Sequence, residues 1–292
     1  MNSFEEKYRE YLSVAENALK NHCSSLNAKT ETLKEAMTYS VLLGGKRIRP
    51  VILLATADML GVPREDALPY AVALELIHTY SLIHDDLPAM DNDDFRRGKP
   101  SNHKVFGEAH AILAGDALLN TAYNHCFKQC LKGERFVRAS AYICEAAGEA
   151  GMIAGQSADL LFSGKKEYTE SDVRFIYQYK TGKLLCAALA VPSVLADNRY
   201  YVELENFGKS IGLLFQLTDD ILDVTGNFDE LGKTIGKDEA ENKPTFVKLK
   251  GLKQTEIEAD LCADSCLYAL DGIDADTEFL KELVFFVRNR KK

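Results

Sequence analysis

Apolar residues recur along the chain with the spacing of buried or amphipathic helices. One such segment begins at Pro50 and stops at Gly61, and an early proline with a closing glycine is typical of a helix. Residues 66–87 are apolar nearly all round, which predicts a helix in the centre of a bundle. No stretch of useful length alternates between polar and apolar residues. The pattern therefore predicts an all-α fold.

Further helices are predicted at residues 107–130, in a long segment that ends near Leu161, and at residues 202–223. Another is predicted at residues 169–180, where Thr169 and Asp172 have the spacing of a capping box. No linker separates independent halves, so residues 1–292 are expected to form a single domain.

A first acidic group follows the apolar segment 66–87 in the sequence HDDLPAMD. Asp85 and Asp91 would lie about 120° apart on a continuous helix. Pro88 disfavours the helical conformation in the residue before it, so the helix is expected to bend or end there. Such a bend could bring Asp91 back toward Asp85.

A second acidic group, DDILD, contains Asp219, Asp220 and Asp223. Asp219 and Asp223 share a helix face, and Gln216 lies on the same face. One acidic pair would more often be a solvated helix end, but each of these groups closes an apolar helix, where neighbouring carboxylates repel strongly. Magnesium binds one or two carboxylates together with substrate phosphates. The two groups therefore predict a metal-bridged phosphate or diphosphate between them.

Cationic residues recur beside turn signals, and each alone could be a helix cap or a solvated surface residue. Together they predict a second, direct site for phosphate oxygens, which Arg and Lys bind well. The positions concerned are Lys46, Arg47, Arg49, Arg96, Arg97, Lys180, Lys183, Lys233 and Lys237, together with the basic segment VRNRKK at residues 287–292.

The composition narrows the classes of function. The formal charge of −9 argues against nonspecific nucleic-acid binding, which needs a basic face. The chain has no apolar run long enough to span a membrane, and its first residues lack the pattern of a secretory signal. The 7 scattered cysteines favour reduced, buried thiols in a cytoplasmic protein over a zinc site.

These motifs resemble the trans-isoprenyl diphosphate synthase family, in the bacterial short-chain form that makes farnesyl diphosphate. DDLPAMD is similar to the first aspartate-rich motif of the family and DDILD to the second. GGKRIRP, RRGKPSNH, GQSADL, KTG and FQLTDDILD follow in family order. The resemblance implies a helical bundle around a central cavity, the isoprenoid synthase fold, and a homodimer.

The resemblance also implies roles for individual residues. Three magnesium ions are expected, with manganese as an alternative: Asp85 and Asp91 would bind two, Asp219 the third, and Asp86, Asp220 and Asp223 would assist. The residues implied for the allylic diphosphate are Arg96, Lys180 and Lys233. Those implied for isopentenyl diphosphate are Lys46, Arg49, His78 and Arg97. The Lys180 carbonyl, the Thr181 hydroxyl and the Gln216 side chain would stabilise the allylic cation and orient the reactants.

The product is expected to be farnesyl diphosphate. Ser81 and Tyr80 precede Asp85 by four and five residues, about 6 to 7.5 Å along the helix. In this family an aromatic residue at the position of Tyr80 resembles a floor that stops the growing chain. A geranylgeranyl diphosphate synthase is the alternative within the family. A class I terpene cyclase would carry a different second motif, and a catalytically silent partner subunit should have lost an acidic group or its arginines.

Overall fold

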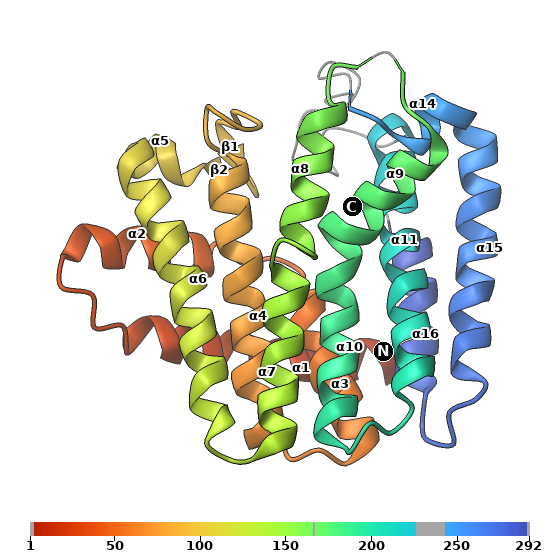
Figure 1. Ribbon diagram of the computed structural model, residues 1–292, viewed down its shortest axis with the longest axis horizontal. Coiled ribbons are helices and arrows are strands. Elements are labelled where there is room, and N and C mark those ends of the chain that lie inside the picture. Colours follow the sequence, from red (N-terminus) through yellow and green to blue (C-terminus); the bar gives the residue numbers. More distant parts are fainter. Residues whose placement is uncertain (1–2, 166, 226–242, 291–292) are drawn as a thin grey trace. The chain divides into compact units, whose positions relative to one another are not determined.

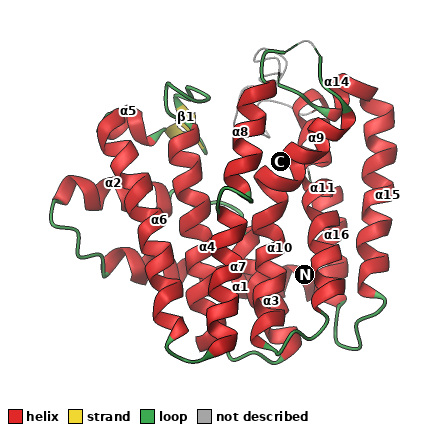
Figure 2. Ribbon diagram, in the orientation of Figure 1, coloured by secondary structure: helices red, strands yellow, loops and turns green. Residues whose placement is uncertain are grey.

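The structure is a computed structural model that describes residues 3–165, 167–225 and 243–290. Helices account for most of these residues and strands for very few (Figure 2), so the all-α prediction is confirmed. The chain divides into two compact units, residues 1–140 and 141–292, and each is described by itself. The single domain expected from the sequence remains a prediction.

The first unit consists of helices and one short hairpin (Figure 1). Its elements are α1 (Ser3–Ser24), α2 (Glu31–Leu42), α3 (Ile48–Leu60), α4 (Arg64–Asp85), β1 (Phe95–Arg96), β2 (Lys99–Pro100), α5 (Asn102–Phe106) and α6 (Glu108–Cys130). Helix α7 (Glu134–Ala147) carries the chain into the second unit.

Helix α4 forms the core of the first unit, as its apolar sequence predicted. It packs against α6 and α3, and Tyr70, Leu74, Leu76 and Ile77 are completely buried. The predicted end of α3 is also present, because Gly61 adopts the left-handed conformation that terminates many helices. The core of this unit therefore holds α4, which ends at the first acidic group.

Arg47 lies in this core rather than at a surface. Its guanidinium donates hydrogen bonds of 2.7 Å to Glu16 and to the buried Glu75, and its side chain is fully buried. A buried charge is tolerated only when it is paired and hydrogen-bonded. The first arginine after the Gly44–Gly45 turn thus holds α1 and α4 together.

A two-residue antiparallel hairpin was not expected from the sequence. Phe95 pairs with Pro100, and Arg96 pairs with Lys99. The loop between them consists of Arg97 and Gly98, with φ of 52° and 72°. Two positive φ values are the arrangement of a type I′ turn, which suits a tight hairpin. Strands of two residues are too short to produce an alternating pattern.

The second unit is also helical (Figure 1). Its elements are α8 (Met152–Phe162), α9 (Glu170–Ile176), the π-helix η1 (Tyr177–Gly182), α10 (Lys183–Leu195), α11 (Tyr201–Thr225), α14 (Phe246–Lys250), α15 (Leu252–Leu270) and α16 (Glu278–Arg288).

Helices α10 and α11 supply much of the core of this unit. Every residue of α10 from Leu184 to Leu195 is buried, and α11 packs against α10, α15 and α16. The predicted capping box is present at the start of α9, where Thr169 and Asp172 exchange hydrogen bonds. The second acidic group therefore lies near the end of a helix that is packed in the core of this unit.

The long helix predicted to end near Leu161 is two helices, α7 and α8. The chain turns between them at Gly148–Gly151, where Gly151 approaches the preceding backbone closely. A Cβ atom at Gly151 would lie 2.2 Å from the carbonyl oxygen of Ala146. Apolar periodicity continues on both sides of this turn, which is why the pattern alone joined the two helices.

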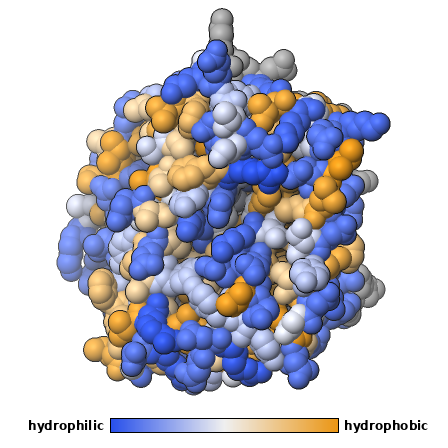
Figure 3. All heavy atoms as spheres, turned by 45° about the vertical axis from the view of Figure 1, so that its right-hand side comes forward, coloured by the Kyte–Doolittle hydropathy of each residue, from blue (hydrophilic) through white to orange (hydrophobic). Residues whose placement is uncertain are grey.

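On the face drawn in Figure 3, polar and hydrophobic side chains are interspersed. Among the helices that the structure describes, none combines the length and the hydrophobicity needed to cross a membrane.

All seven cysteines are present as free thiols, and five of them are buried.

Candidate active site

The first acidic group lies at a turn that follows α4. The helix ends at Asp85, with Asp86 as its capping residue, and the chain then reverses around Pro88. The backbone N–H of Asp91 donates a 2.9 Å hydrogen bond to the carbonyl oxygen of Asp85. The turn predicted from Pro88 therefore exists, and it brings Asp91 back to Asp85.

Asp86 differs from its neighbours because it is buried and paired with Arg96. The Arg96 Nε donates a 3.0 Å hydrogen bond to Asp86 Oδ1, and Nη2 makes a second contact with the same oxygen. Burial raises the pKa of Asp86 above its ordinary value, although the guanidinium partly opposes this shift. Arg96, expected to bind the allylic diphosphate, thus also supports the first acidic turn.

Arg97, in the loop of the hairpin, lies against the Gly44–Gly45 turn. Its Nη1 donates a hydrogen bond to the carbonyl oxygen of Gly44. A Cβ atom at Gly45 would lie 2.7 Å from the guanidinium carbon. Glycine at this position therefore makes room for the arginine, and Arg97 is placed beside the turn that leads to Lys46.

His78 lies in a cationic environment. Burial lowers the pKa of its imidazole well below the ordinary value, and positively charged neighbours lower it further. Those neighbours are Arg49, Arg97, Arg96 and Arg47. Arg49 and Arg97, two of the other residues implied for isopentenyl diphosphate, are thus near enough for their charges to lower the pKa of His78.

Tyr80 and Ser81 lie one turn before Asp85 on α4. Tyr80 is 6% exposed and packs edge-to-face against His84 with ring centroids 5.7 Å apart. Burial raises the pKa of Tyr80 to about 12. The Ser81 hydroxyl donates a 2.9 Å hydrogen bond to the carbonyl oxygen of His78. Tyr80 therefore faces the side of α4 that carries His84, while Ser81 follows the side of Asp85.

In the second unit, most of the predicted residues line one cavity of about 170 Å³. Helix α11 contributes Gln216, Asp219 and Asp220, and η1 contributes Lys180 and Thr181. The remaining lining residues are Asp159, Ile176, Tyr177, Lys243, Pro244 and Thr245. Five of the residues predicted from separate motifs are thus brought together in space.

Lys180 and Thr181 are held by hydrogen bonds to neighbouring helices. The Lys180 Nζ donates a 2.6 Å hydrogen bond to Asp159 on α8. The Thr181 hydroxyl donates a 2.6 Å hydrogen bond to the Gln216 Oε1 on α11. Both residues belong to the π-helix η1, a rare form that is frequent at functional sites.

The three carboxylates of the second acidic group have different surroundings. Asp219 accepts a 2.8 Å hydrogen bond from Arg290, and its side chain remains 36% exposed. Asp220 is buried and accepts hydrogen bonds from Tyr177 and from the backbone N–H of Phe246. Asp223 is buried near the end of α11. Asp219 is therefore the most accessible of the three.

Sequence reasoning did not assign a role to Asp159, Tyr177 or Lys243, and it treated Arg290 only as part of the basic segment at residues 287–292. Asp159 lies within the GQSADL motif, but spacing alone does not connect it to Lys180. Tyr177 and Lys243 are recognised only when the fold brings them to η1 and α11. The pairing of Arg290 with Asp219 also depends on the fold. Lys233, implied for the allylic diphosphate, and Lys237 lie outside the described residues.

The donor atoms fit hard divalent cations, which bind carboxylate oxygens. Asp85 and Asp91 are adjacent at the first turn. Asp219 forms an ion pair with the guanidinium of Arg290. Within the described ranges, no three His, Cys, Asp or Glu side chains converge on a preformed metal centre. Metal binding at these residues would therefore use few protein ligands in each place, as magnesium with a bound phosphate does.

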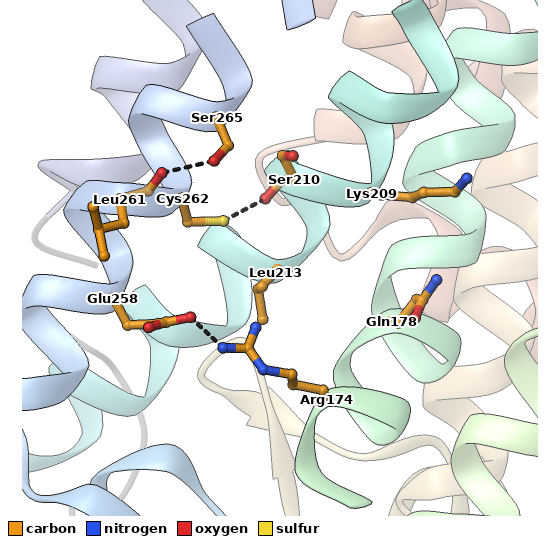
Figure 4. A pocket seen from close by; sticks show the side chains of 9 residues that line it. All are labelled: Arg174, Gln178, Lys209, Ser210, Leu213, Glu258, Leu261, Cys262 and Ser265. Carbon is orange, nitrogen blue, oxygen red and sulfur yellow. Dashed lines mark hydrogen bonds and ion pairs between the residues drawn. The ribbon is translucent and has the colours of Figure 1, made fainter. Parts of the chain in front are cut away.

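Another cavity of the second unit, about 300 Å³ in volume, has a different character. Figure 4 shows Arg174 of α9 directed toward Glu258 of α15, while Cys262 donates a hydrogen bond to the carbonyl oxygen of Ser210. Arg174 also pairs with Glu170. This cavity holds none of the residues predicted for metal or diphosphate binding, so the cavity beside η1 is the candidate site.

Comparisons with known proteins agree with this reading. The family model described as Polyprenyl synthetase matches residues 30–268. The chain is 41% identical over 286 residues to the farnesyl diphosphate synthase of Micrococcus luteus, a match that covers 97% of each chain. It is 45% identical over 248 residues to the chloroplastic geranylgeranyl pyrophosphate synthase of Capsicum annuum, covering 83% of this chain and 67% of the relative.

A solved structure is similar over nearly the whole chain. It is the geranyltransferase of Helicobacter pylori complexed with magnesium and isoprenyl diphosphate, with a TM-score of 0.86 and 32% identity. The match covers 99% of this chain and 97% of that one. Together with the family model and the relatives, it shows that this chain belongs to the polyprenyl synthetase family and is a prenyltransferase.

Proposed function

We propose that the protein condenses isopentenyl diphosphate with dimethylallyl diphosphate and then with geranyl diphosphate, which gives farnesyl diphosphate. The observation that carries the proposal is the cavity beside η1, where Lys180, Thr181, Gln216 and Asp219 meet. Cationic, hydroxyl, amide and carboxylate groups in one place suit a reaction in which a diphosphate leaves and a carbocation must be stabilised.

In this proposal the allylic diphosphate is bound by Arg96, Lys180 and Lys233. Departure of the diphosphate breaks the bond between its oxygen and the allylic carbon, and the bond electrons stay with the oxygen. Cationic side chains stabilise the charge that develops there. Lys180 is suitable because its ammonium is already held in place by Asp159.

The allylic cation that remains is attacked by the C3–C4 double bond of isopentenyl diphosphate. A new carbon–carbon bond forms, and a proton is lost to the released diphosphate. The Thr181 hydroxyl and the Lys180 carbonyl stabilise the cation, and the hydrogen bond between Thr181 and Gln216 orients this pair. Neutral His78, together with Lys46, Arg49 and Arg97, binds isopentenyl diphosphate.

Bound magnesium would neutralise the allylic diphosphate and make it a better leaving group. We propose Asp85, Asp91 and Asp219 as direct ligands for three ions, with manganese as an alternative. Asp86 and Asp220 are buried and hydrogen-bonded, which supports the assisting roles proposed for them. Asp223 is assigned the same assisting role. A homodimer in the cytoplasm is the proposed form of the enzyme.

Geranylgeranyl diphosphate is the alternative product, and the similarity to the Capsicum annuum enzyme favours it as the second candidate. A catalytically silent partner subunit is a weaker alternative, because both acidic groups and both arginines after the first group are present. The deciding experiment is incubation of the purified protein with dimethylallyl diphosphate, isopentenyl diphosphate and magnesium, followed by product sizing. A C15 product supports the proposal, C20 supports the alternative, and absence of diphosphate release would indicate a silent subunit.

A further inference from the structure

Three elements of the second unit meet at one oxygen atom, Asp220 Oδ2. The hydroxyl of Tyr177, the first residue of η1, donates a hydrogen bond to this atom. The backbone N–H of Phe246, the first residue of α14, donates another, of 2.8 Å. All three residues are buried, so η1, α11 and α14 are joined through a buried junction at the wall of the cavity beside η1.

The junction also includes ring packing. The rings of Tyr177 and Phe246 have centroids 5.9 Å apart, and the Phe246 N–H lies 3.3 Å from the Tyr177 hydroxyl oxygen. The tyrosine hydroxyl therefore donates to Asp220 and also receives the backbone N–H of Phe246. Removal of this single oxygen would change both contacts while the ring could stay in place.

Tyr177 helps to fix the position of the π-helix that carries Lys180 and Thr181. On one side of η1, a Cβ atom at Gly155 would lie 2.0 Å from the backbone nitrogen of Lys180. On another, a Cβ atom at Gly212 would lie 2.7 Å from the Cα of Gly182. Close backbone approaches thus locate the later turn of η1, and the Tyr177 hydroxyl supplies a side-chain attachment at its start.

We propose that Tyr177 is a positioning residue for the allylic diphosphate, acting through η1 on Lys180 and through Asp220 on the second acidic group. This inference rests on the proposed function, which assigns Lys180 to that diphosphate. It assigns Asp220 the task of anchoring Tyr177 and Phe246 through Oδ2, while the more accessible Asp219 serves as the metal ligand. Tyr177 itself need not touch the reacting atoms.

The Tyr177→Phe variant tests this role because it removes the hydroxyl and keeps the ring. Tyr70→Phe is the matched control: Tyr70 is also buried, and its hydroxyl donates a 2.9 Å hydrogen bond to the Phe136 carbonyl in the first unit. Each change removes one buried hydroxyl, so similar losses of thermal stability are expected. Circular dichroism and melting curves of both variants establish that each is folded.

The kinetic measurement compares the Michaelis constants of the two substrates. For Tyr177→Phe, we expect the KM for the allylic diphosphate to rise about 10-fold, as loss of one well-placed interaction would give, while the KM for isopentenyl diphosphate changes less than about 2-fold. Tyr70→Phe should leave both constants near those of the unmodified protein. Unchanged constants for Tyr177→Phe, or an equal rise for both substrates, would overturn the assignment.

A binding measurement separates this inference from the proposed function. Isothermal titration with inorganic diphosphate and magnesium should show weaker binding by Tyr177→Phe than by Tyr70→Phe, by about 10-fold, whether or not turnover occurs. If the unmodified protein makes no prenyl product, the proposed function fails, and the titration alone decides the role of Tyr177. Equal diphosphate affinity in the two variants would then refute it.

Discussion

Arg290 holds Asp219, the acid that the second motif presents to the candidate site. The Arg290 Nη2 donates a 2.8 Å hydrogen bond to Asp219 Oδ1 and a 2.7 Å hydrogen bond to the carbonyl oxygen of Phe215. The guanidinium also lies over the Phe215 ring, 3.8 Å from its centroid. The Arg290 guanidinium thus binds the same carboxylate that is proposed as a metal ligand.

Replacement of Arg290 by Ala should therefore tighten magnesium binding in the absence of substrate. The guanidinium and the metal compete for the same carboxylate, and we expect the apparent dissociation constant measured by calorimetry to fall about 3- to 10-fold. Arg288→Ala is the control, because it removes an equal charge whose partner is Asp260. Equal magnesium affinities in the two variants would show that Arg290 does not compete.

The close approach of Arg97 to Gly45 gives a second prediction. Gly45→Ala should displace the guanidinium and raise the KM for isopentenyl diphosphate by about 10-fold, since one charged contact is disturbed. Gly133→Ala is a matched control: φ is +129° at Gly133 and +132° at Gly45, but the space around Gly133 is open. Both variants carry similar backbone strain. An equal rise of the KM in both variants would therefore show that strain alone, and not displacement of Arg97, causes the effect.

The pair formed by His22 and His125 predicts a dependence of stability on pH. The His125 Nε2 lies 3.1 Å from the His22 Nδ1. Burial lowers the pKa of His22 to about 4, and the charges of His125 and Lys128 act in the same direction. Between the ordinary value of 6.5 and about 4, the unfolded chain binds a proton that the folded protein does not. Stability should therefore fall as the pH falls through this range.

In His22→Asn this part of the loss should disappear. The free energy of unfolding is measured with urea at pH 7 and at pH 4.5. Its decrease between these two pH values should be about 1 kcal/mol smaller in His22→Asn than in the unmodified protein, allowing for solvent screening of a half-buried pair. His110→Asn, at an exposed histidine, should behave like the unmodified protein. An identical pH dependence in all three proteins would contradict the role of His22.

Tyr80 provides the test of product length. If its ring forms the floor of the tail pocket, Tyr80→Ala should lengthen the main product by at least one C5 unit. Tyr80→Phe is the control, because it keeps the ring and should keep the product length. Chromatography of the dephosphorylated products gives the answer. A C20 product from the unmodified protein, or the same length from Tyr80→Ala, would show that another residue forms the floor.

Structural features in which a residue acts on its near neighbours could be predicted from the sequence. Pro88 predicted the turn that returns Asp91 to Asp85, and Thr169 with Asp172 predicted the cap of α9. The hairpin around Arg97 was missed, because two-residue strands leave no periodic signal. The break between α7 and α8 was missed because apolar spacing continues through the turn at Gly151.

The sequence by itself determined the all-α class, the helices that hold the acidic groups, and the residue types suited to magnesium and diphosphate. These follow from spacing along one helix or one turn, which is a short-range property of the chain. Only the tertiary structure decided that Asp159 holds Lys180, that Tyr177 anchors to Asp220, and that Arg290 pairs with Asp219. Such partners lie far apart in the sequence, and the packing of whole helices brings them together.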